Sequence, residues 1–156
     1  MNDGSQTLRR LDTARPFVSA IRDAWLPRSA MIAHPDVEVR TSLMSALRAD
    51  GWEAIGAHCG TEVVRWLALA DLAGKPRPTL LVLSPSLRAA GGARINGAIA
   101  ASVGDAPILY LSDGDNHATE CALGSSRSRV ARWPLDLDDF RTIVELLVQS
   151  PARPRT

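Results

Sequence analysis

A run of four aliphatic residues near the middle of the chain, Leu80 to Leu83, most constrains the fold. It lies within the stretch 79–87 (TLLVLSPSL), carries no polar residue at alternate positions, and ends at Ser84 and Pro85. A strand that is apolar on both faces is typical of a parallel sheet covered by helices on both sides. In such a sheet, ligands bind where the carboxyl ends of the strands meet their loops. Ser84 is therefore the first candidate for a functional residue.

The rest of the chain alternates between short apolar runs and amphipathic stretches. Besides the central run, the pattern predicts strands at 30–33, 53–57, 107–111 and 130–133, with a helix after each of the five. The third and fourth helices are expected at 93–102, after a loop at 91–92, and at 117–123. Such alternation predicts an α/β fold, here a flavodoxin-like doubly wound sheet of five parallel strands in the order 2-1-3-4-5 with helices on both faces.

Helix ends are predicted from capping residues. Asp36, Thr61 and Asp136 are expected to cap the amino ends of the first, second and last helices. Gly51 and Gly74 are expected to end the first and second helices. The inward face of the last helix is predicted from i, i+3, i+4, i+7 spacing as Phe140, Ile143, Val144 and Leu147.

A length of 156 residues suits one domain, which we expect at 29–150. The segment 1–28 is expected to be an extension with a helical arm, since Phe17, Ile21 and Trp25 share one helical face. The arm could pack on its own domain or form a dimer or partner contact, and the sequence leaves both open. Residues 151–156 are expected to form a disordered tail.

Composition excludes several function classes. A net charge of +1 gives no general attraction to nucleic acid or to a membrane surface. The apolar runs are too short to cross a bilayer and residues 1–10 are too polar for a signal peptide, so a cytoplasmic location is expected. Cys59 and Cys121 lie far apart without metal-ligand spacing and are expected to be ordinary buried or half-buried thiols.

Residues 29–149 resemble a response-regulator receiver domain. The likeness is carried by AMIAHPDVEVRTSLMSALRADGW (30–52), PTLLVLSPSL (78–87), PILYLS (107–112) and RVARWPLDLDDF (129–140). In that family, two acidic residues after the first strand and an aspartate at the end of the third strand hold magnesium, and this aspartate accepts a phosphoryl group. The resemblance implies a place in bacterial two-component signalling or transcription regulation.

The carboxylates of that family are missing at the matching positions. The acidic pair falls on His34 and Pro35, and the phosphoacceptor position is occupied by Ser84. Magnesium prefers hard oxygen ligands that usually include carboxylates, and an acyl phosphate needs a carboxylate acceptor. Asp36 is the nearest remaining acid, but helix capping is its expected role. We therefore expect no phosphoacceptor, no resident metal or cofactor, and no enzymatic activity.

The other conserved-type positions of the family are mostly replaced as well. The lysine before a proline at the end of the fifth strand falls on Trp133, and the aromatic residue of that strand falls on Val130. Arg132 is one residue away and so is expected on the opposite face. The single lysine, Lys75, lies before the third strand, at the wrong end of the sheet. Only Ser112 matches the family, so the chain looks like a pseudo-receiver.

Other groups of residues suggest further sites, each with a competing explanation. One such group could bind a transition metal at the carboxyl edge of the sheet and comprises His34, Asp36, Asp113, Asp115 and His117. The competing explanation is that Asp113 and Asp115 belong to a DGDN turn, which favours these residues for backbone reasons. A Ser84, His34, Asp36 nucleophile lacks the GxSxG elbow. The basic group Arg127, Arg129, Arg132 is too small to indicate nucleic acid binding.

Two functions are predicted from these residues. The first is a non-phosphorylatable pseudo-receiver that regulates through protein contacts, with a signalling protein or kinase or as a homodimer. By resemblance, the contact face is built from the fourth helix, fifth strand and fifth helix, about 115–149. The apolar face of the amino-terminal arm is the other expected contact. The alternative is a regulatory module that binds a neutral or nucleotide-like ligand in the degenerate pocket, where Trp133 would cover the serines; its expected residues are His34, Pro35, Asp36, Ser84, Ser112 and Trp133.

Overall fold

The computed structural model describes residues 28–88, 96–103, 106–112, 114 and 127–149. Within these residues, five parallel strands form one sheet in the order β2-β1-β3-β4-β5, which confirms the predicted order. No helix in these ranges is long and apolar enough to cross a membrane. The elements are β1 Ser29–Ala33, α2 Val37–Ala49, β2 Glu53–Ala57, α3 Gly60–Leu72, β3 Leu80–Leu83, α4 Asn96–Val103, β4 Ile108–Ser112, β5 Ser128–Arg132 and α6 Leu137–Gln149.

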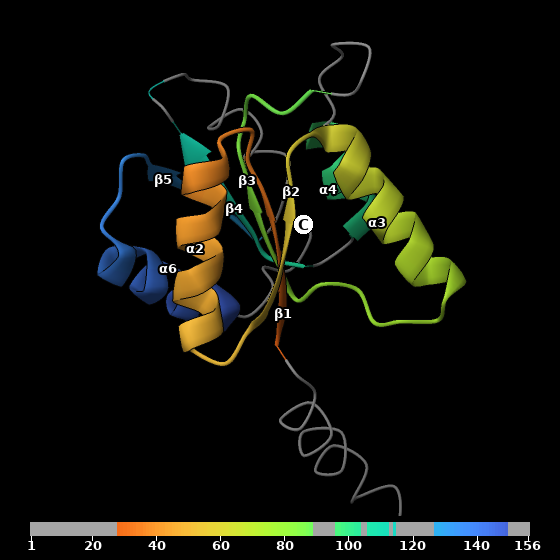
Figure 1. Cartoon of the computed structure of the whole chain (residues 1–156), viewed down its shortest axis with the longest axis horizontal. Coiled ribbons are helices and arrows are strands. Elements are labelled where there is room, and N and C mark those ends of the chain that lie inside the picture. The colour runs from red at the N-terminus through yellow and green to blue at the C-terminus, as the bar shows by residue number, and fades with distance from the viewer. Residues whose placement is uncertain (1–27, 89–95, 104–105, 113, 115–126, 150–156) are drawn as a thin grey trace, which may run out of the picture.

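Helices cover both faces of the sheet. α2 and α6 lie on one face, and α3 and α4 lie on the other (Figure 1). All four residues of β3 are fully buried: Leu80 and Val82 pack in the cluster under α2 and α6, and Leu81 and Leu83 in the cluster under α3 and α4. Burial on both faces explains why this strand has no polar alternation.

The last helix packs through the face predicted from its spacing. Phe140, Val144 and Leu147 are buried against the sheet, and Ile143 is half-buried at the edge of the same cluster. Burying an aromatic and several aliphatic side chains supplies most of the stability of such a helix, since isolated helices of this length are marginal in water.

Capping agrees with the prediction at two of three positions. Asp36 Oδ1 accepts hydrogen bonds from the backbone N–H groups of Glu38 at 2.8 Å and Val39 at 3.4 Å. Asp136 Oδ1 accepts from the N–H of Asp138 at 3.0 Å. The prediction for Thr61 was wrong: α3 begins at Gly60, so Thr61 lies inside its first turn.

Several predicted boundaries shift by one or two residues, among them β1, which begins at Ser29, and β4, which spans Ile108–Ser112, and several predictions lie outside the described residues. β5 spans Ser128–Arg132 rather than 130–133, because its first two residues, Ser128 and Arg129, are polar and give no apolar signal. The helix predicted at 93–102 is described from Asn96 to Val103, and its predicted first residues, 93–95, lie outside the described ranges. The predicted arm, the loop at 91–92, the helix at 117–123 and the tail at 151–156 all fall outside the described ranges.

Candidate functional site

Ser84 lies at the carboxyl end of β3 and is only 4% exposed. Its N–H donates to the carbonyl oxygen of Ala33 in β1 at 2.9 Å. Its Oγ lies 2.7 Å from the Oγ of Ser86 and accepts the N–H of Ser86 at 3.3 Å, while its carbonyl accepts the N–H of Leu87 at 3.2 Å. The hydroxyl is thus engaged in the turn that follows the strand, a local role that serine side chains often have.

The loop after β1 is held by its own backbone and side chains. The N–H of His34 donates to the carbonyl of Ala57 at 3.0 Å, and His34 Nδ1 accepts the N–H of Asp36 at 3.0 Å. Arg40 Nη1 donates to the carbonyl of His34 at 2.6 Å. Asp36 caps α2, so its carboxylate is already used by two backbone donors. Pro35 is exposed between them.

Ser112 and Trp133 meet at the carboxyl ends of β4 and β5. Ser112 is 8% exposed and its Oγ accepts the N–H of Gly114 at 3.2 Å, while its carbonyl accepts the N–H of Trp133 at 2.6 Å. The half-buried side chain of Trp133 packs against the apolar cluster under α2 and α6. Trp133 therefore contributes apolar area to the core, as the indole ring commonly does.

The six predicted pocket residues all lie at one edge of the sheet, where β1, β3, β4 and β5 end. The ligand pocket itself stays a prediction. Of the transition-metal set, His34 and Asp36 have the local partners given above, and the remaining three members fall outside the described residues. Lys75 lies in the loop that enters β3, at the opposite edge from Ser84.

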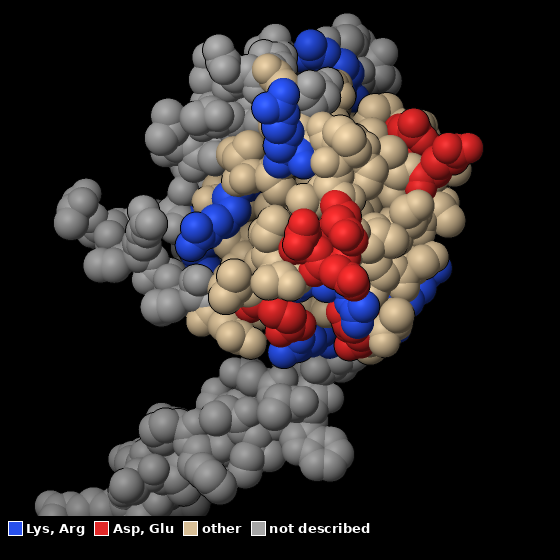
Figure 2. Space-filling model, turned by 90° about the vertical axis from the view of Figure 1, so that its left-hand side faces the viewer, with Lys and Arg blue, Asp and Glu red and all other residues tan. Residues whose placement is uncertain are grey.

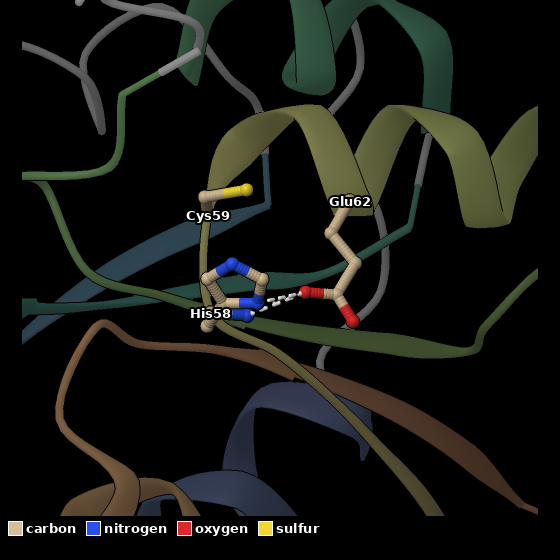
Figure 3. A group of neighbouring side chains, drawn as sticks. All are labelled: His58, Cys59 and Glu62. Atoms are coloured by element: carbon tan, nitrogen blue, oxygen red, sulfur yellow. Dashed lines mark hydrogen bonds and ion pairs between the residues drawn. The ribbon is translucent and has the colours of Figure 1, made fainter. Parts of the chain in front are cut away.

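A second group of chemically active side chains lies at the same edge, where β2 meets α3, and the sequence pattern did not predict it. His58 and Cys59 follow β2 directly, and Glu62 is in the first turn of α3 (Figure 3). Glu62 Oε2 accepts the N–H of His58 at 3.1 Å and pairs with His58 Nδ1. The signal was the motif HCGTE immediately after a predicted strand.

The pKa of Glu62 is lowered from its ordinary value. The main cause is the hydrogen bond from the backbone N–H of His58, which stabilises the carboxylate, and partial burial opposes it. The charges of His58 and Arg40 lower the pKa further. Glu62 is therefore held as an anion beside an imidazole and a thiol.

Comparison with known proteins bears on the fold. No family model matches the sequence, and no curated protein matches it either. A response regulator receiver domain from Clostridium thermocellum superimposes with a TM-score of 0.65 over 79% of this chain and 94% of that one, at 14% identity. The chain has the fold of a receiver domain. This confirms the fold that the sequence resemblance implied.

Two further receiver structures show the same likeness. The chemotaxis response regulator CheY4 of Vibrio cholerae has a TM-score of 0.58 and 16% identity, covering 78% of this chain and 99% of that one. The beryllofluoride-activated NtrC4 receiver domain, a dimer, has a TM-score of 0.60 and 13% identity over 78% of this chain and 97% of that one. The receiver fold places Ser84, His34 and Pro35 at the edge of the sheet where parallel α/β folds bind their ligands.

Proposed function

We propose that this receiver-fold chain is a regulatory module of bacterial two-component signalling or transcription regulation that acts without being phosphorylated. It works in the cytoplasm by binding another protein, either a signalling partner or a second copy of itself. Its role is regulatory rather than catalytic.

The observation that carries the proposal is the environment of Ser84. A serine occupies the position at the end of β3 where the resemblance places an aspartate, it is 4% exposed, and its hydroxyl is hydrogen-bonded to Ser86. Beside it, the loop after β1 presents His34 and Pro35 where an acidic pair would be needed. A magnesium ion would meet few anionic oxygens here, since Asp36 is committed to the cap of α2.

A contact surface is supported on the side of α2 and α6, which Figure 2 shows with acidic and basic side chains close together. Two exposed apolar residues lie on α6 at this side: Leu137 is 39% exposed and Leu146 is 61% exposed. Leu146 also lines an open hollow with Asp50, Asp138, Arg141, Thr142 and Glu145. Apolar side chains among paired charges are typical of a protein interface with a polar rim.

Chemical phosphorylation tests the first half of the proposal. The full chain is incubated with acetyl phosphate and magnesium, and its intact mass is measured beside a phosphorylatable receiver domain as positive control. We expect no phosphoryl adduct on this chain. A stoichiometric adduct that disappears in Ser84→Ala would overturn the proposal.

A further inference from the structure

His58, Cys59 and Glu62 bring three different metal-binding groups together at the junction of β2 and α3. An imidazole nitrogen, the Cys59 Sγ and a Glu62 carboxylate oxygen all lie within 4.8 Å of one another (Figure 3). Cys59 and Glu62 are half-buried and His58 is exposed, so solvent can reach the group. This position is separate from the β3 and β4 ends where the degenerate receiver pocket was predicted.

We propose that His58, Cys59 and Glu62 bind one zinc(II) ion, with water completing the coordination. A thiolate, an imidazole and a carboxylate form a donor set that zinc accepts, whereas magnesium prefers oxygen ligands alone. Three protein ligands with a fourth open position is a common zinc arrangement. The proposal goes beyond the regulatory function above and does not depend on it.

The geometry needs only side-chain movement. Zinc bonds of about 2.0–2.3 Å place tetrahedral ligand atoms roughly 3–4 Å apart. The three ligand atoms are already within 4.8 Å of one another. The side chain of His58 is 67% exposed and that of Glu62 31%, so both can rotate without repacking the core. The backbone of β2 and α3 can therefore stay in place.

The charges also fit a divalent cation. Glu62 Oε2 pairs with His58 Nδ1, so two atoms that can both serve as ligands already face each other. Zinc binds cysteine as a thiolate, histidine as a neutral imidazole and glutamate as a carboxylate. The resulting thiolate and carboxylate balance the two positive charges of the ion. The charge of Arg40, which acts on Glu62, opposes binding, but its guanidinium also donates to the carbonyl of His34.

Without metal, Glu62 has a simpler role. Its carboxylate accepts the N–H of His58, a pattern similar to the glutamate of a capping box at a helix start. Cys59 occupies the N-cap position of α3 but makes no side-chain cap hydrogen bond. The thiol is thus not required for the cap, and a role in metal binding would explain its place there.

Cobalt(II) titration tests the site, because cobalt occupies zinc sites and its bond to a thiolate gives an intense near-ultraviolet absorption. The full chain is kept reduced and titrated with cobalt, followed by zinc. We expect a saturable band at one cobalt per chain that zinc abolishes. Absence of a thiolate–cobalt band at cobalt concentrations well above that of the protein would overturn the proposal.

Variants assign the band to its ligands. Cys59→Ser should abolish it, and Cys121→Ser, which removes the other cysteine, should retain it. His58→Ala and Glu62→Gln should each weaken cobalt binding by at least about tenfold. Glu53→Gln, which removes an exposed carboxylate at the start of β2, serves as the matched control for Glu62→Gln and should leave binding unchanged. Circular dichroism checks that each variant is folded. A band that survives Cys59→Ser, or is lost in a folded Cys121→Ser variant, would contradict the assignment.

Discussion

The backbone N–H of Ser84 donates to the carbonyl oxygen of Ala33 across the β1–β3 pair at 2.9 Å. His34 follows Ala33 directly, so this bond sets the loop after β1 beside the end of β3. By the sequence resemblance, these positions match those where receiver domains have their magnesium ligands and phosphoacceptor. Here the fold brings them together while the side chains lack the carboxylates that the chemistry needs.

Substitutions at Ser84 should separate structure from charge. Ser84→Ala should lower the free energy of unfolding by about 0.5–1.5 kcal/mol, because it loses the hydrogen bonds of the Ser84 Oγ to the hydroxyl and the N–H of Ser86, a residue that water can reach. Ser84→Asp should destabilise more at neutral pH, since a carboxylate at a 4% exposed position loses hydration. Urea unfolding of both variants measures this. Equal stability of Ser84→Asp and wild type would show that the edge accommodates an anion.

The ion pair between the end of α2 and α6 should make stability depend on acid. Arg141 Nε donates to Asp50 Oδ2 at 2.8 Å, and Arg141 Nη2 also pairs with Asp50 Oδ1. Arg141 thereby lowers the pKa of Asp50 below its ordinary value of 3.8, while slight desolvation opposes this. Asp138 lies 3.7 Å from Arg141 Nη1 and shares the same cation.

Because the native pKa is lowered, the unfolded chain binds a proton at Asp50 first as the pH falls. The stabilisation by this pair is fully present at pH values above 3.8, the ordinary pKa of Asp50. It is lost as the pH falls through the lowered pKa of Asp50 in the folded protein. Asp50→Asn should therefore show a shallower loss of stability in acid than wild type, measured by urea midpoints. Glu53→Gln, which removes an exposed carboxylate from β2, is the control. Identical acid profiles for Asp50→Asn and wild type would refute the prediction.

Gly51 ends α2 in the left-handed region, with φ at +86°. No atom lies within 4 Å of the position a Cβ would take, so the cost of substitution comes from the backbone alone. Gly51→Ala should destabilise the protein by about 1–2 kcal/mol. Gly51→Asn should cost less, because asparagine tolerates this conformation. Thermal unfolding compares the two, and an equal cost for both would contradict the backbone explanation.

The sequence predicted the inner strands well because their signal is burial. β2 was found at the predicted bounds, and β3 coincides with the apolar run Leu80 to Leu83. β5 was predicted two residues late, because Ser128 and Arg129 carry no apolar signal on an edge strand. The missed cap at the start of α3 has a similar cause, since Thr61 has the right residue type but Gly60 already belongs to the helix.

The sequence predicted those residues of the candidate site whose location follows directly from their place at a strand end or a helix start. Strand ends placed Ser84 and Ser112 at the carboxyl edge, and capping chemistry assigned Asp36. The cluster around Cys59 was missed because the spacing of the two cysteines carries no sign of it. Its three ligands come from a strand end and a helix turn, and their distances depend on how the helix starts.

The proposed contact surface predicts a position-specific effect on association. Leu146 is 61% exposed on α6, and Leu72 is 86% exposed at the end of α3, on the other side of the sheet. Leu146→Glu should abolish association, measured as dimerisation by light scattering or as capture of a partner protein from the native cytoplasm. Leu72→Glu should leave the same association intact. Loss in both variants, or in neither, would count against the α6 surface.

The most direct measurement for the central claim is a titration of the full chain with magnesium and then beryllofluoride, followed by amide chemical shifts. As a positive control, the variant with His34→Asp, Pro35→Asp and Ser84→Asp restores the three missing carboxylates and should respond to magnesium. We predict that the wild-type chain shows no saturable change with either reagent. A saturable response of the wild type, centred on the residues around Ser84, would contradict the account.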